Sequence, residues 1–125
     1  MTTRPRTTKT TVPALVLLKA AAEAAQSKKA VDIVGLDLTQ LQGVADYFLI
    51  CSGQSEPQVK AITEAVEEKL RLAGAKPWHV EGLSRRWMLL DYVDVVVHVF
   101  HEQTREYYLL ERLWGDAGSV DLGLD

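Results

Sequence analysis

An almost uninterrupted apolar segment that runs directly into an amphipathic helix constrains the fold of this chain most. The segment is ADYFLICSG, residues 45–53, and its composition is typical of a central strand covered on both faces. In the following SEPQVKAITEAVEEKLRLAG, Ser55 and Gln58 have capping-box spacing and Gly74 is a natural helix stop. The apolar stripe of that helix consists of Val59, Ile62, Val66, Leu70 and Ala73. A strand passing into a helix in this way predicts an α/β fold with a right-handed crossover.

The other predicted elements complete a single α/β domain. Apolar spacing and turn signals predict a helix over 12–28, strands over 30–38 and 76–82, a hairpin over 85–101 and a last helix over 104–115. We therefore expect a mixed, about five-stranded sheet flanked by three helices. The domain should span residues 12–117, between a disordered basic tail at 1–11 and a flexible C-terminal tail at 118–125.

Charge is unevenly distributed along the chain. The formal net charge is -3, although the first eleven residues carry Arg4, Arg6, Lys9 and no acid. The remaining body is therefore acidic, which repels nucleic-acid phosphates and suits a basic protein partner. The tail itself is open to three interpretations: an RNA-touching arm, a remnant of a transit peptide, or a merely solvated segment.

Neither a membrane nor an oxidising compartment is indicated. No apolar run approaches the roughly 20 residues that span a bilayer, and the N-terminus lacks the apolar core of a signal peptide. The single cysteine, Cys51, excludes an internal disulfide and suits a reducing compartment. We expect a cytoplasmic protein.

The hairpin RRWMLLDYVDVVVHVFH carries an unusual pair of aromatic residues. A two-residue turn at Tyr92–Val93 would place Trp87 opposite His98. Because side chains alternate along strands, one face then carries six residues of mixed type: Trp87, Leu89, Asp91, Asp94, Val96 and His98. The other face is uniformly apolar and belongs to the core.

The mixed face has two interpretations, which the sequence leaves open. An aromatic anchor with an apolar surround and a charged rim is typical of a binding patch. Alternatively, a helix covers this face as well, and Trp87 is its largest core residue. The turn adds a further question, because Val93 is β-branched and two-residue hairpin turns favour positive φ. Either the loop is longer, which shifts the pairing, or another residue adopts that conformation.

No catalytic or metal-binding constellation is evident. His98 and His101 lie three apart on a strand and so point to opposite faces, which prevents them from sharing one ion. Cys51 sits in an apolar strand and is expected to be a buried, inert thiol. Asp91 and Asp94 are better explained by turn capping or solvated rim charge than by catalysis. The chain is therefore predicted to be a binding protein without cofactor or metal, and not an enzyme.

Five segments in order resemble one known family. ADYFLICSG, QVKAI, EG, WMLLDYVDVVVHVF and YYLLERLWGDA, between residues 31 and 117, are similar to the ribosomal silencing factor family, RsfS, also called Iojap-like. The family usually has glycine at the position of Val93. The resemblance implies a nucleotidyltransferase-like fold without the active site, in agreement with the missing carboxylate set.

The resemblance also implies a partner and a mechanism. Such proteins bind the fourteenth protein of the large ribosomal subunit, keep the small subunit from joining, and repress translation when nutrients are low; organellar relatives act in large-subunit assembly. The family's binding surface includes the tryptophan that corresponds to Trp87. Leu89, Asp91 and His98 extend this partner-binding surface through their predicted place on the same face. Homodimerisation through the same patch, and a minor contact with ribosomal RNA, are further expectations.

Two functions from other classes compete with this hypothesis. A degenerate nucleotidyltransferase-like nucleotide-binding module would need two carboxylates at positions i and i+2 of a strand beside the Gly53 turn, which the sequence lacks. The other is a structural subunit of a different acidic-to-basic assembly.

Overall fold

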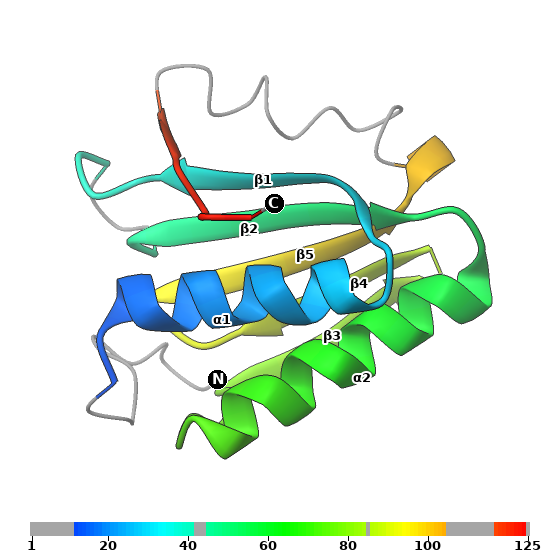
Figure 1. The fold of residues 1–125 in the computed structure, drawn as a ribbon, viewed down its shortest axis with the longest axis horizontal. Coiled ribbons are helices and arrows are strands. Elements are labelled where there is room, and N and C mark those ends of the chain that lie inside the picture. The colour runs from blue at the N-terminus through cyan, green and yellow to red at the C-terminus, as the bar shows by residue number, and fades with distance from the viewer. Residues whose placement is uncertain (1–11, 42–44, 85, 105–116, 125) are drawn as a thin grey trace.

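A single mixed sheet with two helices on one face forms the described part of the molecule (Figure 1). The computed structural model describes residues 12–41, 45–84, 86–104 and 117–124. In chain order the elements are α1 (Ala14–Ser27), β1 (Val31–Asp37), β2 (Tyr47–Gly53), α2 (Glu56–Leu72), β3 (His79–Ser84), β4 (Trp87–Asp91), β5 (Val95–His101) and β6 (Gly118–Val120). The predicted α/β class is confirmed. Most of the helix expected over 104–115, and the whole tail at 1–11, lie outside the described residues.

The sheet has six strands in the order β3-β4-β5-β2-β1-β6. β2 and β5 are the parallel pair, and the other neighbours are antiparallel. The chain leaves β2 through α2 and returns to β5 after the edge hairpin of β3 and β4. The central strand predicted from residues 45–53 is thus confirmed as β2, which lies between β5 and β1.

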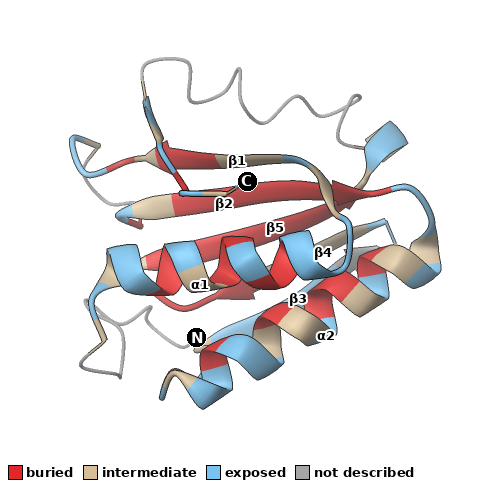
Figure 2. Ribbon diagram, in the orientation of Figure 1, coloured by how far each residue is buried: buried red, intermediate tan, exposed pale blue. Residues whose placement is uncertain are grey.

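The main core lies between the sheet and the two helices. α1 and α2 lie side by side across one face of the sheet, and their inward residues are buried (Figure 2). Leu17 and Leu18 from α1, with Ile62 and Leu70 from α2, are fully buried in this cluster. Each such side chain stabilises the fold by about 1.5–3 kcal/mol relative to exposure. A second, smaller cluster lies on the opposite face and includes Leu36, Phe48, Ile50, Val96 and Phe100.

The start of α2 carries the predicted cap, with one addition. Ser55 Oγ accepts a hydrogen bond from the Gln58 N–H at 3.2 Å, as in a capping box. Gln58 Oε1 accepts from the Gln54 N–H at 2.6 Å, and its Nε2 donates to the carbonyls of Lys28 and Lys29 at 3.1 and 3.0 Å. This single side chain therefore ties the start of α2 to the end of α1.

The sixth strand is the main departure from the predicted sheet. Gly118–Val120 pairs antiparallel with β1, although residues 118–125 were expected to form a flexible tail. Leu122 is only 9% exposed and belongs to the main core. A Cβ atom at Gly35 would lie 2.8 Å from Leu122 Cδ2, so the absence of a side chain there makes room for this segment. The sequence gives little signal because a three-residue strand has no measurable periodicity.

In the part of the chain that the structure describes, neither helix is both long enough and apolar enough to cross a membrane.

Candidate functional site

The β4–β5 hairpin has a longer loop than the sequence predicts. Asp91 pairs with Val96, Leu89 with His98 and Trp87 with Phe100. The predicted pairs, Trp87 with His98 among them, were therefore wrong by two residues. Because a shift of two preserves the alternation of side chains, Trp87, Leu89, Asp91 and His98 still project to one face.

Val93 occupies the strained position that the sequence pointed to. Its φ is 74°, in the left-handed region that disfavours β-branched residues, and its side chain is buried. Asp91 Oδ1 accepts a hydrogen bond from the Val93 N–H at 2.7 Å. Asp91 is itself buried, at 8% exposed. The Asp91 carboxylate therefore caps the turn. Its hydrogen bond also stabilises the unfavourable backbone conformation of Val93.

An aromatic cluster occupies the face of the sheet opposite the two helices. We define it as Phe48 on β2, Trp87 on β4, and His98 and Phe100 on β5. The Trp87 and Phe100 rings stack with centroids 4.9 Å apart, and Phe48 lies 4.8 Å from His98. The His98 and Phe100 rings are nearly parallel, at 9°, with centroids 6.1 Å apart. The cluster gives Trp87 a rigid backing of neighbouring rings.

Trp87 and His98 are also joined by a hydrogen bond. The indole Nε1–H of Trp87 donates to His98 Nδ1 at 3.2 Å. A neutral imidazole that accepts at Nδ1 carries its proton on Nε2. That Nε2 is buried and has no hydrogen-bond partner among the described residues. Burial lowers the pKa of His98 to about 4, against a smaller opposing effect of Asp91. The ring is therefore neutral at physiological pH.

The four predicted partner-binding residues share one face but differ in exposure. Trp87 and Leu89 are half-buried, whereas Asp91 and His98 are buried beneath that face. The prediction missed two aromatic residues of this face. Phe100 lies two positions beyond His98 on the same strand, so the alternation of side chains could have placed it there. Phe48 could not have been placed in this way, because its position beside His98 depends on the β2–β5 pairing.

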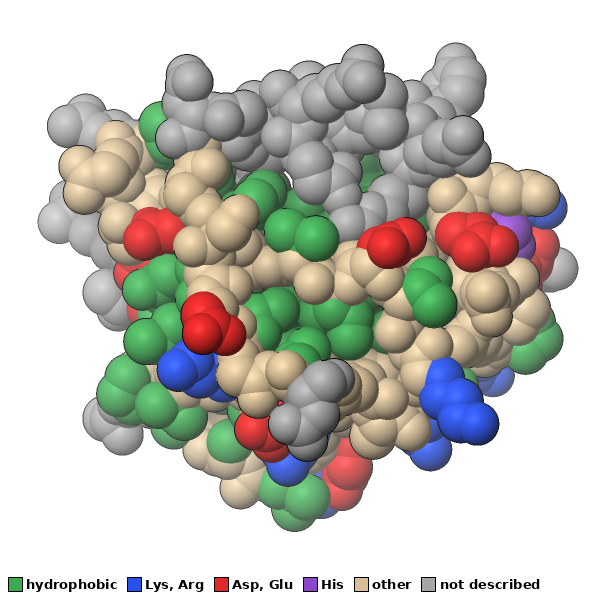
Figure 3. Space-filling view, turned by 45° about the horizontal axis from the view of Figure 1, so that its top comes forward, with side chains coloured by type: hydrophobic (Ala, Val, Ile, Leu, Met, Phe, Trp, Pro, Cys, Tyr) green, Lys and Arg blue, Asp and Glu red, His purple; other side chains and the backbone are tan. Residues whose placement is uncertain are grey.

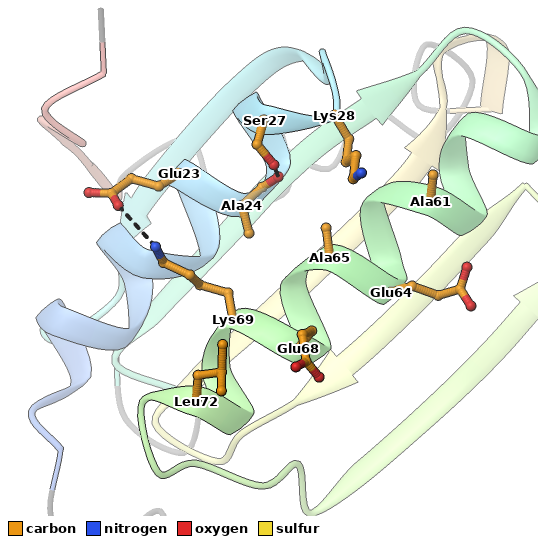
Figure 4. Close-up of a pocket in the computed structure, with 10 residues that line it drawn as sticks. All are labelled: Glu23, Ala24, Ser27, Lys28, Ala61, Glu64, Ala65, Glu68, Lys69 and Leu72. Atoms are coloured by element: carbon orange, nitrogen blue, oxygen red, sulfur yellow. Dashed lines mark hydrogen bonds and ion pairs between the residues drawn. The ribbon is translucent and has the colours of Figure 1, made fainter.

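Hollows that were not predicted lie on the helical side of the molecule, and two of them run along α2. One, of about 520 Å³, lies between α1 and α2, with Ala24, Ala61 and Ala65 along it and an ion pair at its rim (Figure 4). In that pair, Lys69 Nζ lies 3.7 Å from a Glu23 oxygen. The other, of about 750 Å³, runs along α2 beside Met88 of β4. Both have mixed charged rims, and neither contacts the aromatic cluster.

The described residues offer no metal site. They contain no group of three or more His, Cys, Asp or Glu side chains that could hold an ion. On the face shown in Figure 3, hydrophobic side chains gather in the middle, carboxylates are scattered around them, and the described Lys and Arg side chains form no continuous patch.

The sequence matches one family model and several proteins of known name. Residues 10–124 match the family model described as "Ribosomal silencing factor during starvation". The chain is 49% identical to the ribosomal silencing factor RsfS of Bacillus subtilis over 85% of this chain and 91% of that protein. It is also 34% identical to the chloroplastic Iojap protein of Zea mays, covering 83% of this chain and 46% of that protein.

Solved structures show the same likeness. A crystal structure of a Chromobacterium violaceum protein is similar with a TM-score of 0.80 and 38% identity, covering 83% of this chain and 88% of that one. A crystal structure from Bacillus halodurans has a TM-score of 0.74 and 41% identity, with 85% and 97% covered.

Proposed function

Because the chain belongs to the ribosomal silencing factor family, we propose that it binds the fourteenth protein of the large ribosomal subunit and thereby blocks joining of the small subunit. The proposed effect is repression of translation under nutrient limitation, exerted in the cytoplasm by occupancy of a surface and not by catalysis.

The observation that carries the proposal is the half-buried pair Trp87 and Leu89. These residues lie two apart on β4 and therefore on the same face of the sheet. Trp87 is stacked on Phe100 and hydrogen-bonded to His98, so its ring is ordered before any partner arrives. Ordered aromatic anchors lose little conformational entropy on binding and commonly dominate interfaces.

Charge supports a basic partner. The chain carries 17 acidic and 14 basic residues, so it attracts a cationic protein surface while being repelled by exposed RNA. Under this proposal Asp91 and His98 support the surface from below, and contact with ribosomal RNA is minor. Self-association through the same face would compete with ribosome binding.

The test is substitution of the anchor. Trp87→Ala should weaken binding to purified large subunits by about 30-fold or more, since such anchors are commonly worth about 2 kcal/mol. Binding is measured by co-sedimentation, and folding of the variant by circular dichroism and chemical denaturation.

Trp78→Ala is the matched control. Trp78 precedes β3, and its ring contacts His79 at 5.8 Å. The control should retain binding. If Trp87→Ala binds large subunits as the wild type does, or loses several kcal/mol of stability, Trp87 is a core residue and the proposed surface is wrong.

Subunit joining is tested separately. In a sucrose gradient the protein should migrate with free large subunits and be absent from joined ribosomes, and its addition should lower the joined fraction. Migration with joined ribosomes would contradict the steric mechanism.

A further inference from the structure

The Trp87–His98 hydrogen bond makes His98 the most informative residue of the aromatic cluster. His98 is 5% exposed, so little of it is available to a partner directly. Its Nδ1 nevertheless accepts the indole N–H of Trp87 at 3.2 Å, and Trp87 is half-buried on the same face.

The buried ring is poorly explained by stability alone. Its Nε2–H has no acceptor among the described residues, and an unsatisfied buried donor costs about 1–3 kcal/mol. Phe48, Phe100 and Val96 belong to the apolar cluster on this face, so a phenylalanine in place of His98 would bring no unpaired polar atom of its own. An apolar residue, however, could not accept the indole hydrogen.

From this geometry we propose that His98 is a positioning residue. It fixes the plane and direction of the Trp87 indole through Nδ1, so that the ring is presented to the partner in one orientation. The Nε2–H, which finds no acceptor in the part of the chain that the structure describes, is the structural cost of retaining an acceptor at Nδ1. This inference rests on the proposed function for its effect on binding, but the orientation itself can be measured without a ribosome.

Two variants separate a positioning role from a role in stability. One should weaken binding to large subunits without loss of stability, and the other should lose stability but retain binding. His98→Phe keeps a ring and removes both the Nδ1 acceptor and the Nε2–H donor. We expect it to be at least as stable as the wild type and to bind large subunits roughly three- to tenfold more weakly, the effect of losing one hydrogen bond. His98→Asn places an amide oxygen near the position of Nδ1 but leaves a void. It should be less stable and yet retain binding when folded.

The orientation is read from the indole N–H resonance of Trp87 in a ¹H–¹⁵N spectrum, assigned by its loss in Trp87→Phe. His98→Phe should shift this resonance towards that of a solvent-exposed indole, and His98→Asn should leave it close to the wild-type position. The same spectra report whether each variant is folded.

The outcomes distinguish the two proposals. If the wild type fails to bind large subunits but the indole resonance responds as expected, the proposed function fails and the positioning role stands. If binding of the two variants follows their stability, or if His98→Phe leaves the indole resonance unchanged, His98 is only a packing residue and the inference is overturned.

Discussion

Val93 combines an unfavourable backbone conformation with a favourable buried side chain. Its φ of 74° costs about 1–3 kcal/mol, while its buried side chain contributes about the same amount in the opposite direction. The two effects are therefore nearly balanced at Val93. The buried valines of β5 have no positive φ and so no such strain to offset.

We therefore predict that Val93→Gly changes the free energy of unfolding by less than about 1 kcal/mol. Val97→Gly, at a fully buried position of β5, should cost about 3 kcal/mol because no strain is relieved. Urea denaturation of both variants measures the contrast. Equal losses would show that the left-handed conformation of Val93 carries no strain.

His98 should make stability depend on pH. Its pKa is lowered from 6.5 to about 4 by burial, so between these values the unfolded chain binds the proton and the folded chain does not. The contribution of His98 to the free energy of unfolding should therefore be fully present above about pH 6.5. It should decline as the pH falls towards 4, by at most roughly 3 kcal/mol.

The measurement is denaturation of the wild type and His98→Phe across this pH range. Carboxylates titrate in both proteins, so the difference between the two curves isolates the histidine. A constant difference from pH 7 to 4 would contradict the assignment of a buried neutral ring.

At the scale of elements, Gln58 departs from an ordinary capping box. A capping box accepts Glu as readily as Gln, and the helix dipole favours the negative charge. Here the amide Nε2 donates to the Lys28 and Lys29 carbonyls, and a carboxylate would face those two oxygens without a donor.

Gln58→Glu is therefore expected to lower the free energy of unfolding by about 1 kcal/mol, despite its favourable position in the helix. Ser55→Ala, which removes only the cap, should cost a similar amount and serves as the reference in thermal and chemical denaturation. A neutral or stabilising effect of Gln58→Glu would show that the bonds to α1 contribute nothing.

These elements also show which features of the fold and the candidate site can be predicted from the sequence. α2 was predictable because Ser55, Gln58 and the apolar stripe are all local signals, and Gly74 indeed has a positive φ of 94°. The shared face of Trp87, Leu89, Asp91 and His98 was predictable because alternation survives an even shift of register. The register itself was not, since the loop length depends on the cap that Asp91 provides to Val93.

The remaining gaps come from contacts between distant segments. Phe48 joins the aromatic cluster only through the parallel pairing of β2 with β5. Likewise, the exposure of Trp87 relative to His98 follows from the packing of several strands, and no local pattern encodes it.

At the scale of the whole molecule, the acidic balance predicts how binding responds to salt. If the partner is a basic ribosomal protein, the association rate constant should fall as ionic strength rises, while the dissociation rate constant changes little. Surface plasmon resonance with the purified fourteenth protein at 50 to 500 mM salt tests this. An association rate that is independent of salt would mean that an apolar contact alone guides the encounter.

The late position of β6 has a consequence for synthesis of the chain. β1 is among the first strands translated, and its partner β6 is the last of the described elements to be made. Until residues 118–122 emerge, the nascent protein carries an open strand edge at β1 and an uncovered Gly35, and such edges promote association with other chains. Closing this edge requires a contact between opposite ends of the domain, which is intrinsically slow. Chaperone dependence should thus persist until β6 has emerged and paired with β1.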